Sequence, residues 1–235
     1  MIAHYALIIP EFLQNMDDTH SFELVLDTLT ATRRIYRAAA SDASLSREIA
    51  RDVQSALELI MKALNHEYAK IIAEGLRVTA SLIFALESTI NTTSKGVVAP
   101  VFAAVLEKLR KSDIDQEVKQ SSLISIAGIA SVAHQQIGAA GLADMVKLFV
   151  ERLDSELTRD SALKGFTSMA SAKERMAFPG LPEIMDKLLL LLRKNQRSLH
   201  IITFEAIIAF LSRYEQDFIQ MTPVILNEIK PFLNE

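Results

Sequence analysis

The sequence predicts an all-α protein, an α-solenoid in which pairs of helices stack along one axis. Three observations support this prediction. Half of the 235 residues are apolar while only 6% are aromatic, Gly and Pro number only seven and six, and polar junctions recur at regular intervals. An all-β sandwich would need many more turn residues. Ala, Leu and Ile dominate the composition, which favours helices that pack closely on one another.

The junctions set the length of the repeating unit. They fall at Asp17-Asp18, Asn65-His66, Asp113, Asp154-Ser155 and Asn195. The intervals are about 48, 48, 41 and 41 residues, near the roughly 40–47 of HEAT and armadillo units. The unit is therefore a helix A, a tight turn, a helix B and a looser loop. We predict about five and a half HEAT repeats in residues 1–235, forming one solenoid segment.

Five helix pairs and one single helix follow from these junctions, because an apolar segment of two to four turns stands on either side of each. The predicted pairs are 3–16 with 19–39, 48–64 with 67–86, 97–111 with 114–133, 142–153 with 156–170, and 181–194 with 196–214. The loops SDAS and NTTSKG separate the first three pairs. A last helix near 218–233 has no partner. Such a half repeat exposes an apolar face, so we expect an internal fragment of a longer repeat protein.

The third helix B begins with a capping pattern. Asp113 is placed to cap the N-terminus, and Gln116 stands three residues later, as in a capping box. Asp115 and Glu117 add negative charge where the helix dipole favours it. Asp115 and Lys119 are spaced to pair, for a few tenths of a kcal/mol. Apolar residues then recur on most faces, which predicts a buried inner helix.

The longest uncharged stretch, residues 121–143, raises the question of a membrane span. Ser125, Ser131, His134 and two glutamines interrupt it, and its apolar part is too short to cross a bilayer. The N-terminus lacks the basic region of a signal peptide. We therefore expect a buried helix in a protein without a membrane partner.

Motifs for catalysis are missing from the sequence. There is no Cys, no P-loop, no G-x-G-x-x-G and no G-x-S-x-G. The Asp17-Asp18 pair lies at a turn, where capping is the simpler role. The histidines are scattered singly and do not form a zinc-binding pair; they are His4, His20, His66, His134 and His200. We expect a non-enzymatic protein with no catalytic residue, no cofactor, no metal and no small-molecule substrate.

The charge distribution argues against nucleic acid. The net charge is -4 and both signs are interspersed. Two short basic clusters, Arg33-Arg34 with Arg37 and Arg193-Lys194 with Arg197, lie among acidic neighbours, which favours a solvated face or a protein contact. A HEAT-like DNA glycosylase would need a basic groove with aromatic residues to hold an extruded base, and Trp is absent.

One charged stripe is a candidate binding surface. Glu67, Lys70, Glu74 and Arg77 fall at i, i+3, i+7 and i+10 of the second helix B and share one face. The stripe is either a solvated helix face or part of a concave binding surface, which solenoids commonly present. Equivalent positions on later B helices extend it. The predicted partner-binding residues are Glu67, Lys70, Glu74, Arg77, Lys119, Arg159 and Arg197.

Four stretches resemble a known family. ALNHEYAKIIAEGLRVT (63–79), LRKSDIDQEVKQ (109–120), FVERLDSELTR (149–159) and LLRKNQRSL (191–199) are similar, in this order and at similar intervals, to the middle of the cullin-associated, neddylation-dissociated proteins. The resemblance covers most of the chain from the second repeat onward. The segment DIDQEVK, followed some 75 residues later by LRKNQR, is specific among HEAT proteins.

The resemblance implies a function. The family is a long HEAT superhelix that wraps unmodified cullin–RING scaffolds, promotes exchange of their substrate-receptor modules and cannot coexist with the ubiquitin-like modifier on the cullin. It implies a cullin partner and a cytoplasmic and nuclear location. Family contacts concentrate at the two ends of the superhelix, and this chain resembles the central arch. The alternative is another HEAT scaffold, such as a nuclear-transport receptor or a phosphatase scaffold subunit.

Overall fold

The computed structural model describes residues 5–17, 21–92, 94 and 96–234, and every regular element within them is helical. In chain order the elements are α1 (Tyr5–Met16), α2 (Phe22–Ala39), α3 (Ala43–Arg51), α4 (Val53–Leu64), α5 (Ala69–Ala85), α6 (Val98–Arg110), α7 (Gln116–Leu153), α8 (Arg159–Ala170), α9 (Leu181–Leu192), α10 (Arg197–Tyr214), η2 (Glu215–Met221), α11 (Thr222–Ile229) and η3 (Lys230–Asn234).

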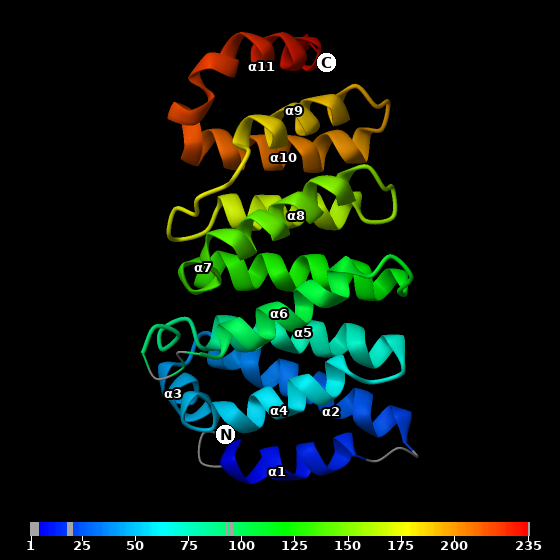
Figure 1. Cartoon of the computed structure of the whole chain (residues 1–235), viewed down its shortest axis with the longest axis vertical. Helices are drawn as coiled ribbons and strands as arrows, with labels where there is room; N and C mark the ends of the chain where they lie inside the picture. Colours follow the sequence, from blue (N-terminus) through cyan, green and yellow to red (C-terminus); the bar gives the residue numbers. More distant parts are fainter. Residues whose placement is uncertain (1–4, 18–20, 93, 95, 235) are drawn as a thin grey trace.

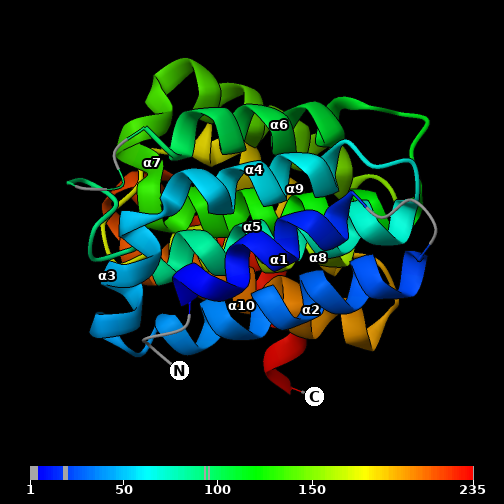
Figure 2. The same ribbon diagram turned by 90° about the horizontal axis from the view of Figure 1, so that it is seen from below.

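The helices stack in chain order along the long axis of the molecule, with the two termini at opposite ends (Figure 1). The B helices form a continuous layer in which each packs on the next, namely α2, α5, the first half of α7, α8 and α10. Seen from below, α4, α6 and α9 of the A layer lie on one side of the stack, with α2, α8 and α10 on the other (Figure 2). The predicted all-α solenoid is confirmed.

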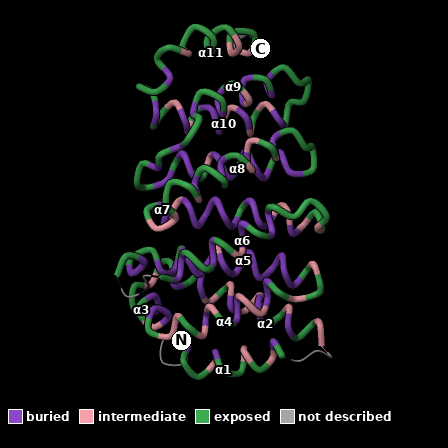
Figure 3. The backbone as a smooth tube through the Cα atoms, in the orientation of Figure 1, coloured by how far each residue is buried: buried purple, intermediate pink, exposed green. Residues whose placement is uncertain are grey.

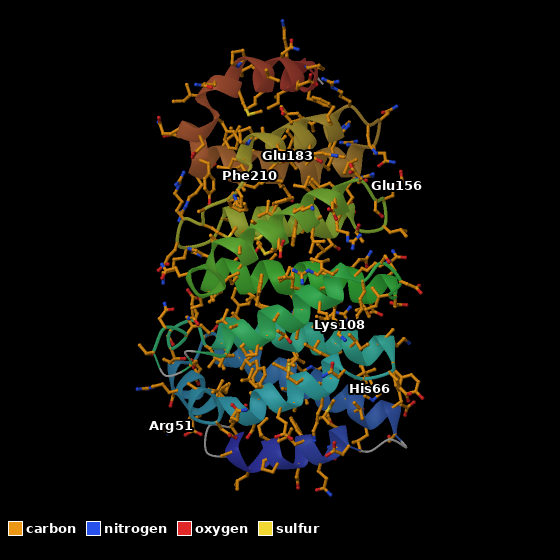
Figure 4. All side chains as sticks on the ribbon, viewed as in Figure 1. Arg51, His66, Lys108, Glu156, Glu183 and Phe210 are labelled. Atoms are coloured by element: carbon orange, nitrogen blue, oxygen red, sulfur yellow. The ribbon has the colours of Figure 1, made fainter. Side chains whose placement is uncertain are left out.

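The tight turns fall at the predicted junctions. Helices are interrupted at residues 65–68, 111–115, 154–158 and 193–196. Asp18 itself lies outside the described residues, as do His4 and His20, but α1 ends at Met16 and α2 begins at Phe22. His66 and Glu156, from two different A-to-B turns, lie along the same edge of the stack (Figure 4). The polar interruptions therefore mark where the chain reverses.

The predicted helix 48–64 is wrong in its boundaries, because the structure contains two helices there. Helix α3 already begins at Ala43, capped by Asp42, whose Oδ1 accepts hydrogen bonds from the backbone N–H groups of Ser44 and Leu45. Asp52 leaves the helical conformation, and its carboxylate accepts a hydrogen bond from the Ser55 hydroxyl at 2.7 Å. The segment is thus divided in two at Asp52, where the backbone leaves the helical conformation.

The junction between the third and fourth repeats also differs from the prediction. No open loop separates 114–133 from 142–153; helical turns continue through α7 with non-helical backbone at Ala133 (φ -134°, ψ 25°) and Gly138 (φ 76°, ψ 160°). The Gly138 conformation is almost exclusive to glycine. The first half of α7 is therefore a helix B, and its second half is the helix A of the next repeat.

The first half of α7 is buried as predicted, with every residue from 121 to 130 buried except Ile124. Among the described helices, α7 alone has the length and apolar composition of a membrane span. It bends at the kink, and it packs against α5, α6 and α8. Its apolar side chains thus form part of the protein core.

The cap of α7 is Asp115 and not Asp113. The helix begins at Gln116, and the Asp115 carboxylate accepts a hydrogen bond from the backbone N–H of Glu117 at 2.8 Å. The predicted pair of Asp115 with Lys119 does not form, because the Lys119 ammonium donates to the Ser112 carbonyl oxygen at 2.5 Å.

The predicted last helix, 218–233, is shorter than expected. Only Thr222–Ile229 is α-helical, and 3-10 turns flank it. Lys230 keeps a helical conformation, but Pro231 lacks the backbone N–H that would continue the i to i−4 hydrogen bonds, in agreement with the change from α11 to the 3-10 turn η3.

The core lies between the two layers and is most continuous in the middle of the stack (Figure 3). Aromatic rings connect the C-terminal repeats across it. The ring of Phe166 contacts those of Phe149 and Phe210 at centroid distances of 5.3 and 5.9 Å, and Phe210 contacts Phe178 at 5.0 Å. Such pairs contribute about 0.5–1.5 kcal/mol each beyond area burial. Phe210 lies inside the stack in Figure 4.

Candidate protein-binding face

The outward side of the B layer is the candidate site, and we call it the B-helix face. Small residues allow its helices to pack closely on the A layer behind them. A Cβ added at Gly165 of α8 would overlap the Phe149 ring, and one added at Gly75 of α5 would lie 2.7 Å from the Ala63 Cβ. Close packing of this kind holds the exposed side chains in a fixed array.

A groove of about 430 Å³ crosses the B-helix face over α2, α5, α7 and α8. Phe84 and Ile124 line it and are 41% and 52% exposed. Its remaining surface is mostly small side chains with three cations. The lining residues are Arg37, Ala40, Arg77, Ala80, Ser81, Phe84, Ile124, Ser125, Ala127, Gly128, Lys164, Gly165 and Ser168. We call this the B-helix groove.

A network of four charges lies beside the groove and joins three repeats. Glu74, only 4% exposed, lies between two guanidinium groups. Its Oε1 is 2.6 Å from Nε of Arg33 on α2, an ion pair without a hydrogen-bonding angle. Its Oε2 accepts a hydrogen bond from Arg77 at 3.2 Å. Arg77 also donates to Glu117 of α7 at 2.7 Å. The network therefore links α2, α5 and α7.

The carboxylates of the network stabilise the charged form of Arg77. Burial by itself would lower the pKa of Arg77, but the hydrogen bonds to Glu117 and Glu74 outweigh it and the pKa of Arg77 is raised. Two acids and two bases offset one another, so Arg77 is largely neutralised. Among the described residues, the ion pairs include neither Arg37 nor Lys164, the other two cations of the groove.

The predicted charged stripe is only partly exposed. Glu67 lies in the turn before α5 and Lys70 in the first turn of that helix, and both are exposed. Glu74 is buried and Arg77 is intermediate. The half of the stripe toward the groove therefore contacts neighbouring side chains, and Glu67 precedes the helix that was predicted to carry it.

The residues predicted on later repeats have different positions. The expectation that Arg159 lines the exposed face is wrong, since it is 3% exposed and donates hydrogen bonds to the carbonyl oxygens of Leu153 and Asp154, at the end of α7. Lys119 is half-buried against Ser112. Arg197 is exposed at the first residue of α10. Arg159 therefore satisfies carbonyl groups that the helix end leaves without partners.

Several groove residues were missed from the sequence. Phe84, Ile124 and Lys164 each stand in a helical pattern that gives no sign of a shared groove. Their proximity depends on the stacking of α5, α7 and α8. Position within one helix cannot reveal that contact.

Residues 2–126 match a known protein family, which is described as "CAND1-like, TPR repeats". A TPR unit and a HEAT unit are both helix pairs, and the spacing of 41–48 residues in this chain exceeds the roughly 34 of a TPR unit.

Three curated relatives are similar over part of the chain. Cullin-associated NEDD8-dissociated protein 1 of Dictyostelium discoideum is 32% identical over 60% of this chain. The protein of the same name in Drosophila melanogaster is 26% identical over 75% of it. Cullin-associated NEDD8-dissociated protein 2 of Mus musculus is 31% identical over 63%. The matches span only 11%, 15% and 12% of these relatives' own lengths.

A solved structure supports the fold alone. The crystal structure of an engineered protein matches with a TM-score of 0.58 at 17% identity, and the match covers 87% of this chain and 80% of the other.

Proposed function

This chain belongs to the CAND1-like repeat family, and from that premise we propose that it is a non-enzymatic scaffold segment that binds a cullin. The family match over residues 2–126 carries the proposal, because the relatives are named for their association with cullins. The exposed B-helix face supports it, since stacked helices present a long surface for protein contact.

We propose further that the segment is a central part of a substrate-receptor exchange factor that acts on un-neddylated cullin–RING ligases in the cytoplasm and nucleus. The names of the relatives, which pair cullin association with NEDD8 dissociation, support this choice. Because the match spans about a tenth of those relatives, the segment would contribute one part of a longer interface.

Exposed charges on the B-helix face are the proposed contacts. Glu67, Lys70 and Arg197 are exposed and do not belong to the buried network, which supports their assignment to this role. Charges of both signs at an interface change the rate of association and the register more than the affinity. Arg77, Glu74, Lys119 and Arg159 are proposed to act indirectly, by holding the helices that carry those contacts.

The experiment measures association of the 235-residue chain with a purified cullin–RING complex by biolayer interferometry. We expect weak binding to unmodified cullin and weaker binding to NEDD8-linked cullin. Lys70→Glu should slow association about threefold or more at low salt, and the difference should shrink as salt screens the charges. Arg77→Glu is unsuitable, because it would set a third carboxylate beside Glu74 and Glu117.

Lys147→Glu is the matched control. Lys147 is an exposed residue on the second half of α7, in the A layer, and its reversal changes the net charge equally. Association rates equally slow in both variants would refute a specific role of the B-helix face. Absence of any binding to cullin by the folded wild-type chain would refute the proposed partner.

A further inference from the structure

We propose that the B-helix groove binds an extended acidic segment of a partner protein with an apolar residue near its centre. This inference goes beyond cullin association, because it follows from the groove itself and holds whichever protein carries the segment. Three features lead to it: an exposed apolar pair, a set of cations and the direction in which the groove crosses the helices.

The middle of the groove offers a seat for one apolar side chain. Phe84 of α5 and Ile124 of α7 are large, exposed and on adjacent helices. Gly128 of α7 lies against the Phe84 ring, since an added Cβ would be 3.2 Å from Cε2 of Phe84. The missing side chain at Gly128 lets this ring pack directly on α7, beside Ile124. An apolar residue placed here would cover both exposed side chains, each a source of favourable burial.

The charge of the groove selects an acidic partner. The described residues that line it include Arg37, Arg77 and Lys164 but no Asp or Glu. Arg77 is offset by Glu74 and Glu117, whereas Arg37 and Lys164 lie on the outermost of the four helices. The available positive charge is thus on the two sides of the apolar seat. Carboxylates on both sides of an apolar residue would complement this pattern.

The geometry of the stack favours an extended segment. The groove crosses from α2 to α8 over three helix-to-helix spacings, each about 8–10 Å, so its length is about 25–30 Å. An extended chain advances about 3.3 Å per residue and spans that distance with about eight or nine residues. The matching ligand is therefore a segment of about nine residues with acidic ends and an apolar centre.

The test uses a fluorescein-labelled nonapeptide with leucine at its centre and alternating aspartate and glutamate on both sides, titrated with the whole 235-residue chain and followed by anisotropy. We expect saturable binding at low salt. A peptide with serine at the centre should bind about threefold or more weakly, and one with lysine in place of the acids should not bind. Equal binding of the leucine and serine peptides would refute the apolar seat.

Variants locate the site. Arg37→Glu combined with Lys164→Glu should weaken binding of the leucine peptide by about tenfold or more. Both side chains are exposed, so the fold should persist, as circular dichroism would show. The matched control is Arg34→Glu with Lys147→Glu, which changes the net charge equally at exposed residues that do not line the groove. It should weaken binding much less.

Two outcomes would overturn the proposal. Equal weakening by the groove variant and the control would show a non-specific charge effect. Binding of a single-stranded oligonucleotide as tight as that of the peptide would indicate a general anion surface. Neither measurement involves a cullin, so a negative result here leaves the proposed cullin binding unaffected. Likewise, failure of the chain to bind a cullin would leave the proposed peptide site unaffected.

Discussion

Glu74 has its carboxylate between guanidinium groups of two different helices, with almost no exposure to water. Removing its charge takes away the ion-pair partner of Arg33 and leaves Arg77 paired with Glu117 alone, and breaking a buried ion pair is strongly destabilising. We expect Glu74→Gln to lower the free energy of unfolding by about 2 kcal/mol, since both arginines are partly exposed. Urea denaturation measures this. Glu67→Gln, in an exposed turn, is the control and should change little.

Tyr5 and Tyr36 are buried, and their hydroxyl oxygens are 3.1 Å apart. Burial is the main cause that raises the pKa of both phenols above the usual value of 10. The folded state thus keeps both protons at a pH where the unfolded chain loses them. Stability is full below pH 10 and falls as pH rises above it, by about 1 kcal/mol per tyrosine between pH 10 and about 11.

The measurement compares urea denaturation of the wild-type chain with the Tyr5→Phe, Tyr36→Phe double variant across this pH range. Other titrating groups are common to both, so the difference isolates the tyrosines. The double variant should lose stability less steeply. Parallel curves would mean that the phenols titrate in the folded state as they do in the unfolded chain.

At the level of single residues, the sequence indicated polarity but not burial. Lys70 and Glu74 lie one turn apart on the same predicted face, yet one is exposed and the other is buried. Glu74 is buried because its carboxylate faces Arg33 of α2 and Arg77, which in turn contacts Glu117 of α7, whereas Lys70 in the first turn of α5 stays exposed. Arg159 is buried for a similar reason, since the end of α7 lies over it. Contacts between repeats leave no trace in the spacing within one helix.

The kink of α7 contains a backbone conformation that favours glycine, at Gly138. Gly138 has φ 76° and ψ 160°, and a Cβ added there would meet nothing within 4 Å. A Gly138→Ala substitution therefore tests backbone strain without a steric clash. We expect a loss of about 1–2 kcal/mol in the free energy of unfolding, measured by chemical denaturation.

Ala140→Ser, at an exposed helical position two residues away, is the control and should have a small effect. An equally small effect of Gly138→Ala would show that the kink of α7 does not depend on the left-handed conformation.

At the level of elements, the sequence predicted most helices well because polar interruptions and apolar periodicity are local signals. The predicted break after residue 133 agrees with the non-helical backbone at Ala133, but the open loop expected before 142 is replaced by helical turns with a second non-helical residue at Gly138. This stretch is uncharged, so the conformation of the connection left no signal in the pattern. At Asp52 the opposite occurred, since an otherwise helical pattern is divided into two helices.

For the whole molecule, stability should vary along the stack. Helices α5 and α7 have neighbours on both sides, whereas α11, at the end of the stack, packs against α9, η2 and η3, with Val224 and Leu226 exposed. In a linear array, opening of an end disrupts fewer contacts than opening of the middle. Hydrogen exchange should therefore be slowest in α5 and the first half of α7 and fastest in α11. Uniform protection from end to end would contradict this expectation.

The overall architecture was predictable because the junction intervals repeat, and a repeat of that length has few alternatives to a stack of helix pairs. The groove was not predictable, since it combines side chains from four helices that are more than a hundred residues apart in sequence at their extremes, Arg37 and Lys164.

The packing order has a consequence for biosynthesis. Helix α5 packs on α2 and α4, α7 on α5 and α6, α8 on α7, and α10 on α8 and α9, so each B helix finds its partners among residues translated before it. Contacts between such near neighbours form quickly, and domains fold in the order in which they leave the ribosome. The nascent chain can thus add one layer at a time. The apolar surface open to a chaperone at any moment is then that of the newest repeat, which the next helices cover.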